Sequence, residues 1–293
     1  MLRRLFTVTT VLALCLFMHG RAGATSVPPG LIAPSSDGVL ISFSAHGKGD
    51  VTLIFVHGWS CDSRYWYRQV PFLSKGHRVV TIDLAGHGHS GSGRKDYTVA
   101  SFGEDVKAVA DGLKARKVIL IGHSMGGAVI AAAAGLMPDR VLGLIGVDTL
   151  HNVEFRYTEE EVRKFVRPFE ENFEKQANEF VRGMFPKGAD ANLVNWIAGD
   201  MSCAIPRVGI SAIRNYLGLF VSGEGAKMFE RLKIPVAAVN ADFWPTNPEA
   251  NRRHMVSFDV AVMKGVGHFP MLERPEEFNR RLSKVIKGLA GRK

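Results

Sequence analysis

The hydrophobic and polar positions of this chain alternate between two kinds of segment. Short runs rich in valine, isoleucine and leucine, typical of strands buried on both faces, recur between stretches with helical spacing. The expected strands lie at residues 38–45, 51–56, 78–83, 117–121, 141–147, 235–240 and 258–263. The expected helices lie at about residues 66–74, 101–115, 127–137 and 275–289. This alternation predicts an α/β protein with a doubly wound, mostly parallel sheet, and a further hairpin is expected across residues 31–45.

Residues 151–230 interrupt this rhythm with a helical pattern that contains no strand. The first helix there is expected to begin at Thr158, because Thr158 and Glu161 have the spacing of a capping box, and to run to about residue 176. Ligands of open α/β sheets bind beyond the carboxyl ends of the strands, so this insertion is expected to form a cap over a binding site. The aromatic residues of the block, most of them expected to serve packing, are Phe165, Phe169, Phe173, Phe180, Phe185, Trp196, Tyr216 and Phe220. The core is expected to comprise residues 25–150 and 231–293.

The first 24 residues have the pattern of a secretory signal peptide. The chain starts with two arginines near its N-terminus, continues with a 14-residue apolar run at residues 5–18, and reaches small residues at Ala22 and Ala24. A run of this length is short for a membrane span, which needs about 20 residues. We therefore expect cleavage and a secreted or periplasmic protein, with an uncleaved N-terminal membrane anchor as the alternative.

Charge and cysteine content bear on partners and metals. The formal charge of +9 falls to +6 without the signal segment, and the basic residues are scattered among acids. No nucleic-acid partner is therefore expected, because nucleic-acid binding calls for a concentrated basic stripe. No Cys/His spacing indicates a metal site. Cys61 and Cys203 are the cysteines beyond the signal segment; an oxidising compartment permits a disulfide between them, and two free buried thiols are the slightly favoured alternative.

A short motif follows the strand at residues 117–121. Gly122-His123-Ser124-Met125-Gly126 has the pattern Gly-x-Ser-x-Gly and leads into the helix expected at residues 127–137. A tight strand-to-helix turn of this kind exposes a nucleophilic serine, and the flanking glycines leave room for its strained backbone. The helix that follows directs its first N–H groups toward developing negative charge. Ser124 is therefore the candidate nucleophile.

A nucleophilic serine needs a histidine base that is held by a carboxylate. His268 has the strongest position among the ten histidines, because it follows the last expected strand in a glycine-rich loop. The carboxylate is expected between Ser124 and His268 in the chain. Asp242, directly after the strand at residues 235–240, is the preferred acid, and Asp148, which follows another strand, is the alternative.

A second glycine loop, His57-Gly58-Trp59, follows the strand at residues 51–56. The backbone N–H groups of Trp59 and Met125 are expected to form an oxyanion hole, since glycine at position 58 lets the backbone approach closely. His57 is expected to orient this loop rather than to take part in the chemistry. The turn at residues 83–90 is expected to serve as scaffold, with its two histidines bracing the loop or lying at the surface.

These motifs together resemble those of the α/β-hydrolase superfamily, in its capped, single-domain branch. The resemblance spans residues 37 to about 290 and includes the glycine-histidine loop that ends at His268. It implies an eight-stranded, mostly parallel sheet, a helical cap between the sixth and seventh strands, a Ser-His-Asp triad and no cofactor. The branch includes esterases, proline iminopeptidases, carbon–carbon bond hydrolases, lactonases and cofactor-free haloperoxidases. Epoxide hydrolases and haloalkane dehalogenases carry aspartate at the nucleophile position, so Ser124 argues against both.

The expected function is a secreted serine hydrolase that cleaves a small carboxylic ester, thioester or lactone through an acyl-enzyme. The alternatives are hydrolysis of an amide or carbon–carbon bond, or perhydrolysis, on the same triad, and a non-catalytic hydrolase-fold binding protein. The expected partner is a small-molecule substrate, with no nucleic acid and no membrane contact beyond the signal segment. The sequence specifies neither the substrate nor the oligomeric state.

Overall fold

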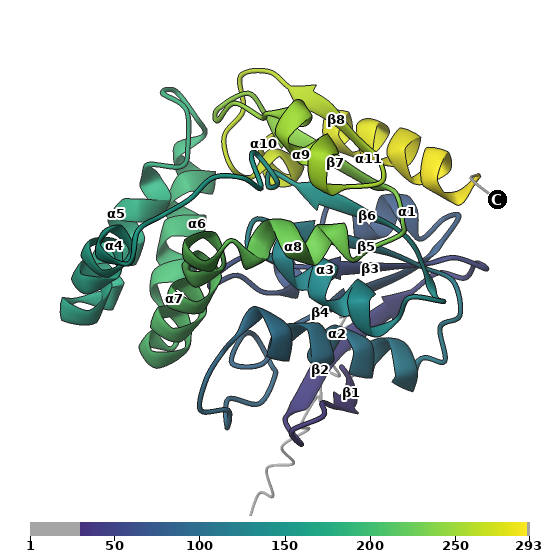
Figure 1. Ribbon diagram of the computed structural model, residues 1–293, viewed down its shortest axis with the longest axis horizontal. Coiled ribbons are helices and arrows are strands. Elements are labelled where there is room, and N and C mark those ends of the chain that lie inside the picture. The colour runs from purple at the N-terminus through teal and green to yellow at the C-terminus, as the bar shows by residue number, and fades with distance from the viewer. Residues whose placement is uncertain (1–29, 292–293) are drawn as a thin grey trace, which may run out of the picture.

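The computed structural model describes residues 30–291, and within them an eight-stranded sheet forms the centre of the molecule (Figure 1). The strands are β1 (Leu31–Pro34), β2 (Leu40–His46), β3 (Thr52–Val56), β4 (Arg78–Ile82), β5 (Val118–His123), β6 (Val141–Val147), β7 (Val236–Ala241) and β8 (Phe258–Met263). Their order across the sheet is β1-β2-β4-β3-β5-β6-β7-β8. The β1–β2 and β2–β4 pairs are antiparallel and all the others are parallel. The predicted α/β class, the mostly parallel sheet and the hairpin at residues 31–45 are confirmed.

Helices cover both faces of this sheet. The helices outside the β6–β7 connection are η1 (Ser63–Trp66), α1 (Val70–Leu73), α2 (Val99–Gly112), α3 (Gly126–Leu136), α9 (Pro248–His254), α10 (Pro270–Glu273) and α11 (Pro275–Ala290). Helices α2 and α3 pack on each other and on one face, whereas α1 and α11 lie together on the other (Figure 1). The sequence pattern did not indicate η1, α9 or α10, because a helix of one or two turns is too short to show a 3.6-residue period.

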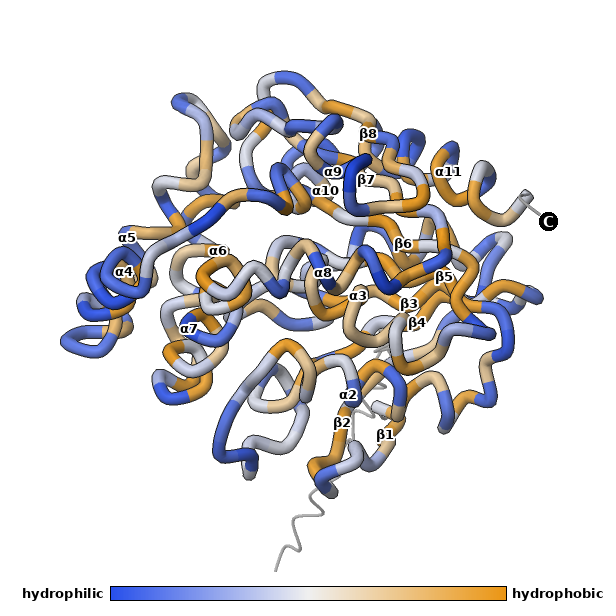
Figure 2. Tube along the Cα trace, viewed as in Figure 1, coloured by the Kyte–Doolittle hydropathy of each residue, from blue (hydrophilic) through white to orange (hydrophobic). Residues whose placement is uncertain are grey.

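The central strands were recognisable because they are apolar on both faces. Every residue of β3, β5 and β7 is buried, as expected for parallel strands covered by helices on either side. Figure 2 shows these strands mostly in the colours of hydrophobic residues, while polar positions gather on the outer turns and helices. The carboxyl ends of β3, β5, β6, β7 and β8 carry the loops that hold the candidate site residues.

The connection from β6 to β7 consists of five helices, as the expected cap requires. They are α4 (Glu159–Glu171), α5 (Phe173–Arg182), α6 (Ala191–Ser202), α7 (Pro206–Ser222) and α8 (Glu224–Glu230). The predicted capping box is present, since Thr158 and Glu161 each accept the other's backbone N–H. The first helix ends earlier than predicted, because Asn172 caps a new helix by accepting the N–H of Lys175. Figure 1 shows α4–α7 grouped beyond one side of the sheet, with α8 leading back to it.

The sequence also predicted an N-terminal signal segment, with a membrane anchor as the alternative, and left the pairing of two cysteines open. The predicted signal segment lies outside the described residues, 30–291. No helix within that range is long and apolar enough to cross a membrane. Cys61 and Cys203 are free thiols; Cys61 is buried and Cys203 is exposed.

A buried ion pair fastens the first hairpin and the β4–α2 loop to the core. The Arg94 guanidinium, in that loop, donates to Asp105 at 2.7 Å and to Asp37 at 2.6 Å. Asp105 is fully buried in α2 and also accepts the Ser35 hydroxyl at 2.7 Å and the Ala85 N–H at 3.1 Å. Burial raises the pKa of Asp105, and its bonds to Arg94 and Ser35 oppose that shift. Removing the arginine would therefore leave a buried carboxylate without its counter-ion.

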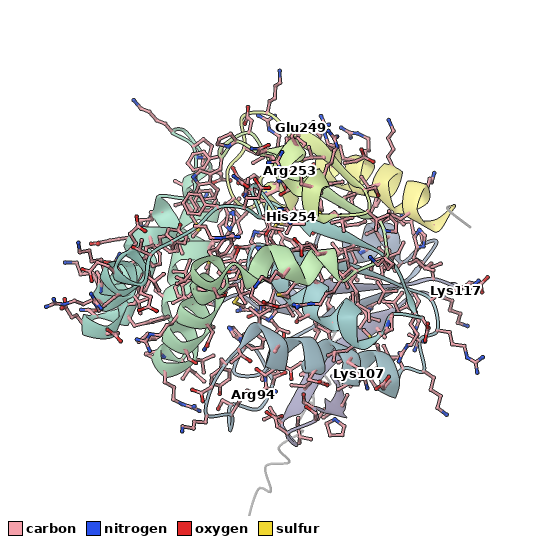
Figure 3. The ribbon with its side chains drawn as sticks, in the orientation of Figure 1. Arg94, Lys107, Lys117, Glu249, Arg253 and His254 are labelled. Carbon is pink, nitrogen blue, oxygen red and sulfur yellow. The ribbon has the colours of Figure 1, made fainter. Side chains whose placement is uncertain are left out.

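We predict that Arg94→Met lowers the free energy of unfolding by about 3–5 kcal/mol, the range for breaking one side of a buried ion pair. Lys107→Met is the matched control, because Lys107 pairs with Asp111 at 2.7 Å on the exposed surface of α2 (Figure 3). That control should change stability by less than about 1 kcal/mol. Urea unfolding at pH 7 measures the stability change in both variants. Equal changes would show that the buried pair contributes no more to stability than the exposed pair.

Candidate active site

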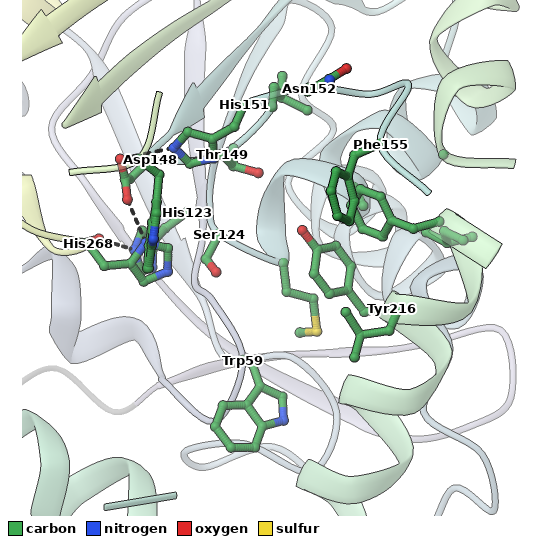
Figure 4. Close-up of a pocket in the computed structure, with 18 of the residues that line it drawn as sticks. Trp59, His123, Ser124, Asp148, Thr149, His151, Asn152, Phe155, Tyr216 and His268 are labelled. Carbon is green, nitrogen blue, oxygen red and sulfur yellow. Dashed lines mark hydrogen bonds and ion pairs between the residues drawn. The ribbon is translucent and has the colours of Figure 1, made fainter. Parts of the chain in front are cut away.

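Ser124 occupies a strained turn between β5 and α3. Its φ is +53°, a left-handed conformation that a serine seldom adopts. A Cβ added to Gly122 would lie 2.2 Å from the carbonyl oxygen of Gly126, and one added to Gly126 would lie 2.7 Å from that of His57. Both glycines are thus required by close approach of the backbone, as the Gly-x-Ser-x-Gly pattern predicts. Ser124 lines the wall of a cavity under the cap (Figure 4).

The two N–H groups expected to form an oxyanion hole belong to Met125, within this turn, and to Trp59, in the loop after β3. Within residues 30–291, no acceptor pairs with the N–H of Trp59 or of Met125, and both residues line the cavity. The Trp59 indole donates to the carbonyl oxygen of Gly209 in α7 at 2.7 Å. The loop that carries the Trp59 N–H is therefore fixed directly to the cap.

His268 follows β8 and is held from several directions. Its ring Nδ1 lies 2.6 Å from Oδ2 of Asp148, and both side chains are buried. Its carbonyl oxygen is 2.8 Å from Nε2 of His123, which donates to it, and its N–H donates to Met184 of the cap at 3.0 Å. These contacts fix the His268 ring beside Ser124 at the same cavity wall (Figure 4).

The preference for Asp242 as the acid partner is wrong in this structure. Asp242 is exposed and accepts the N–H of Gly265 at 2.8 Å, so it braces the loop that precedes His268 instead of contacting the ring. The alternative, Asp148, is the carboxylate that contacts His268. Strands β6 and β7 are adjacent and parallel, so the two aspartates that follow them lie at the same, carboxyl-terminal end of the sheet. Asp148 turns inward because its φ is +43° and its Oδ1 accepts the N–H of Ala241 at 2.8 Å.

Asp148 remains ionised despite its burial. Desolvation raises its pKa, but the hydrogen bond with His268 and the nearby His151 imidazole outweigh that effect, and the net pKa lies well below its ordinary value. The sequence analysis did not predict the approach of His151 to Asp148. The one available signal was the spacing Asp148-x-x-His151, which places both side chains at the same strand end.

The remaining histidines near the site brace loops. His57 donates through Nδ1 to the Gly58 carbonyl at 2.8 Å and accepts the N–H of Leu84 at Nε2 at 3.0 Å, which fits the loop-orienting role expected of it. Burial lowers the pKa of His57, and burial lowers the pKa of His123 and His87 to about 3. These three imidazoles are therefore neutral at ordinary pH. His89, by contrast, is exposed.

The cavity that these residues border has a volume of about 720 Å³, within the range of small-molecule sites. Its walls are mostly aromatic and aliphatic, and of the residues that the structure describes, no Lys, Arg or Glu lines it. Four of the eight cap aromatics singled out in the sequence face it: Phe165, Phe180, Tyr216 and Phe220. Burial raises the pKa of Tyr216 to about 12, so its hydroxyl stays neutral. Residues 30–291 contain no cluster of His, Cys, Asp or Glu suited to hold a metal ion.

We predict that the buried histidines make the folded protein lose stability in acid. Their pKa values are lower in the folded than in the unfolded chain, so their stabilising effect is complete above about pH 6.5 and declines as pH falls toward about 3. Each contributes about 1.4 kcal/mol per pH unit over that range. His87→Leu should therefore flatten the dependence of the unfolding free energy on pH by about that amount between about pH 6 and 4.

Urea unfolding at several pH values measures this slope, and His89→Leu is the control because His89 is exposed. An unchanged slope in His87→Leu would mean that His87 is already protonated in the folded state.

Comparison with known proteins agrees with this geometry. Residues 51–191 match the family model of the alpha/beta hydrolase fold. The dihydrolipoyllysine-residue acetyltransferase component of the acetoin cleaving system of Cupriavidus necator is 27% identical over 273 residues, which cover 86% of this chain and 68% of that protein. A non-heme chloroperoxidase of Streptomyces lividans is 36% identical over 110 residues, which cover 36% of this chain and 40% of that one. The corresponding component of Pseudomonas putida is matched over only 28% of its length.

Solved structures share the fold over nearly the whole described chain. A thermophilic esterase from Thermogutta terrifontis has a TM-score of 0.77 at 21% identity, covering 89% of this chain and 98% of its own. A bromoperoxidase from Bacillus anthracis has a TM-score of 0.75 at 22% identity, covering 88% and 99%. The strand order, the serine turn and these matches lead to one conclusion: the chain has the α/β-hydrolase fold.

Proposed function

We propose that this protein is a serine hydrolase that cleaves a small, uncharged carboxylic ester through an acyl-enzyme on Ser124. One observation carries the proposal: the strained Ser124 turn lies beside the buried His268–Asp148 pair at the wall of an apolar cavity. A serine hydroxyl is a weak nucleophile by itself, and a neutral imidazole held by a carboxylate is the group that activates it.

In the proposed reaction, the Ser124 oxygen attacks the ester carbonyl while Nε2 of His268 takes the hydroxyl proton. Asp148 keeps the proton of His268 on Nδ1 and stabilises the imidazolium that forms. The N–H groups of Trp59 and Met125 donate to the oxyanion, and each such donor contributes about 3–4 kcal/mol to transition-state stabilisation. His268 then returns its proton to the leaving alcohol, and a water molecule hydrolyses the acyl-enzyme by the same route in reverse.

The cavity supports an uncharged, hydrophobic substrate. A charged acyl or alcohol group would lose its hydration among aromatic walls that offer no Lys, Arg or Glu side chain within the described part of the chain. The fold-level neighbours whose names include the word esterase, from Thermogutta terrifontis and Exiguobacterium antarcticum, are compatible with an ester. Perhydrolysis is the second candidate, because relatives named as a chloroperoxidase and a bromoperoxidase share the fold. It would use the same triad, with peroxide in place of water.

The proposed location rests on the sequence alone. The pattern of residues 1–24 supports export to the periplasm or the exterior, and an uncleaved anchor is the alternative. The competing hypothesis is a non-catalytic binding protein with the same fold. Covalent labelling of Ser124 distinguishes a serine hydrolase from such a protein.

We predict that the mature protein hydrolyses p-nitrophenyl esters and that Ser124→Ala abolishes this activity. A fluorophosphonate probe should label the wild type rapidly and covalently and should not label Ser124→Ala, because the alanine has no nucleophilic oxygen. A panel of uncharged acyl chains of increasing length, with one chain ending in a carboxylate, tests the apolar cavity; the charged member should be the poorest substrate. Activity that survives in Ser124→Ala would refute the proposal, and absence of labelling in the wild type would favour a binding protein.

We predict further that Asp148→Asn and Asp242→Asn differ sharply. Asp148→Asn should lower kcat by about 10³–10⁴-fold, the loss typical of replacing the acid in a triad. Asp242→Asn should retain kcat within about twofold, since its carboxylate contacts only the loop N–H of Gly265. Steady-state ester hydrolysis and the thermal unfolding temperature are measured on both. The reverse ranking, in well-folded variants, would return the acid role to Asp242.

A further inference from the structure

Asp148 contacts a second histidine that the proposed mechanism does not use. Nε2 of His151 lies 3.5 Å from Oδ1 of Asp148, while Nδ1 of His268 lies 2.6 Å from Oδ2. The two imidazoles therefore approach different oxygens of one buried carboxylate (Figure 4). His151 also lines the cavity and is partly exposed, whereas Asp148 is fully buried.

The position of His151 is fixed by its neighbours. Its carbonyl oxygen accepts the N–H of Asn247 at 2.6 Å. Its ring packs edge-on against Trp244 with centroids 6.1 Å apart, and Trp244 in turn packs edge-on against His268 with centroids 5.1 Å apart. One indole thus separates two imidazoles that share a carboxylate. Two further ionisable side chains face Asp148 and His268. The His123 ring lies 4.7 Å from that of His268, and the Glu273 carboxylate, which accepts the N–H groups of Gly267 and Phe269, interacts electrostatically with both. The β7–α9 segment contributes the uncharged Trp244 and Asn247.

Electrostatics determines which form of His151 fits there. A lone pair on Nε2 would face a carboxylate oxygen and repel it, so the nitrogen nearest Asp148 must carry a hydrogen. An N–H dipole at this distance withdraws part of the negative potential that Asp148 offers to His268. A second proton on His151 would withdraw more, because two cations would then compete for one carboxylate.

We infer that His151 is a positioning residue of this site, which directs its Nε2–H toward Oδ1 of Asp148, the oxygen that also accepts the N–H of Ala241, and limits how strongly that carboxylate favours a protonated His268. The inference rests on the proposed function, in which His268 must be neutral to accept the Ser124 proton. Its consequence is that the two histidines protonate in a coupled way, and that His151 keeps His268 available as a base at lower pH than Asp148 alone would allow.

The experiment measures the second-order rate at which an uncharged fluorophosphonate labels Ser124 between about pH 5 and 9, which reports on the free enzyme without a known substrate. Wild type, His151→Gln and His151→Phe are compared; glutamine keeps an N–H donor that cannot titrate, and phenylalanine keeps only the ring. The apparent pKa of the acid limb of the rate should rise by about 0.5–1 unit in His151→Phe, which offers Asp148 no N–H, and by less in His151→Gln, which keeps an uncharged donor.

His89→Gln, which changes an exposed histidine, is the control and should leave the acid limb where it is. If the wild type is not labelled at Ser124, the proposed function fails; if it is labelled but the acid limb does not move in either variant, the His151 inference alone fails. Slower labelling at every pH with an unchanged apparent pKa indicates a purely structural role and also overturns it.

Imidazole ¹⁵N shifts of the wild type give a measurement that needs no variant to fold. Coupling predicts that the His268 signal titrates in two steps, one of them coincident with His151. Two independent single-step curves would overturn the inference.

Discussion

The buried carboxylate of Asp148 is the constraint on which the rest of the site depends. It lies at the end of β6, its Oδ1 accepts the N–H of Ala241 from β7, and its Oδ2 pairs with His268 from the loop after β8. A buried charge that lost these partners would cost several kcal/mol, so the three strand ends must meet in one arrangement for the charge to be accommodated. The same contacts therefore stabilise both the sheet and the site. An ionised Asp148 requires the correct register of the neighbouring parallel strands, and that register places His268 beside Ser124.

Much of this arrangement could be predicted from the sequence because local rules dictate it. The fully buried strands appear as continuous apolar runs, and the two glycines around Ser124 are required by backbone contacts shorter than 3 Å. The choice between Asp148 and Asp242 could not be made in that way. Both follow adjacent parallel strands with the same local pattern, and only the left-handed backbone at residue 148 turns its side chain inward. That conformation depends on tertiary contacts, which no short window of sequence contains.

The cap shows the same limit on a larger scale. Helical periodicity indicates its helices, but not which side of each helix meets the core. Half of the aromatics singled out there line the cavity, whereas each of the others contacts an aromatic residue of the core: Phe169 and Phe173 contact Trp59, Phe185 contacts Phe269 and Trp196 contacts Tyr65. The contact that matters most for function could not be read from any periodicity. The Trp59 indole donates to Gly209 in α7, so the backbone N–H proposed for the oxyanion hole is positioned partly by the cap. A cap that shifted would therefore disturb the catalytic donors as well as the cavity wall.

The electrostatic character of the site depends on the absence of positively charged side chains next to Ser124. His57 and His123 lie against the Ser124 turn, and burial lowers the pKa of both, so neither places a positive charge near the nucleophile at neutral pH. At the cavity wall, charge is carried by the Asp148 carboxylate and by the proton that it shares with His268. Glu273, outside the cavity lining, is a second carboxylate that acts on both groups. A transition state that develops one negative charge on an oxyanion and one positive charge on His268 is then stabilised by nearby partners, with little interference from other ions in an apolar cavity. The same burial that keeps these histidines neutral makes the fold sensitive to acid, so the conditions that favour catalysis and those that favour folding coincide near and above neutral pH.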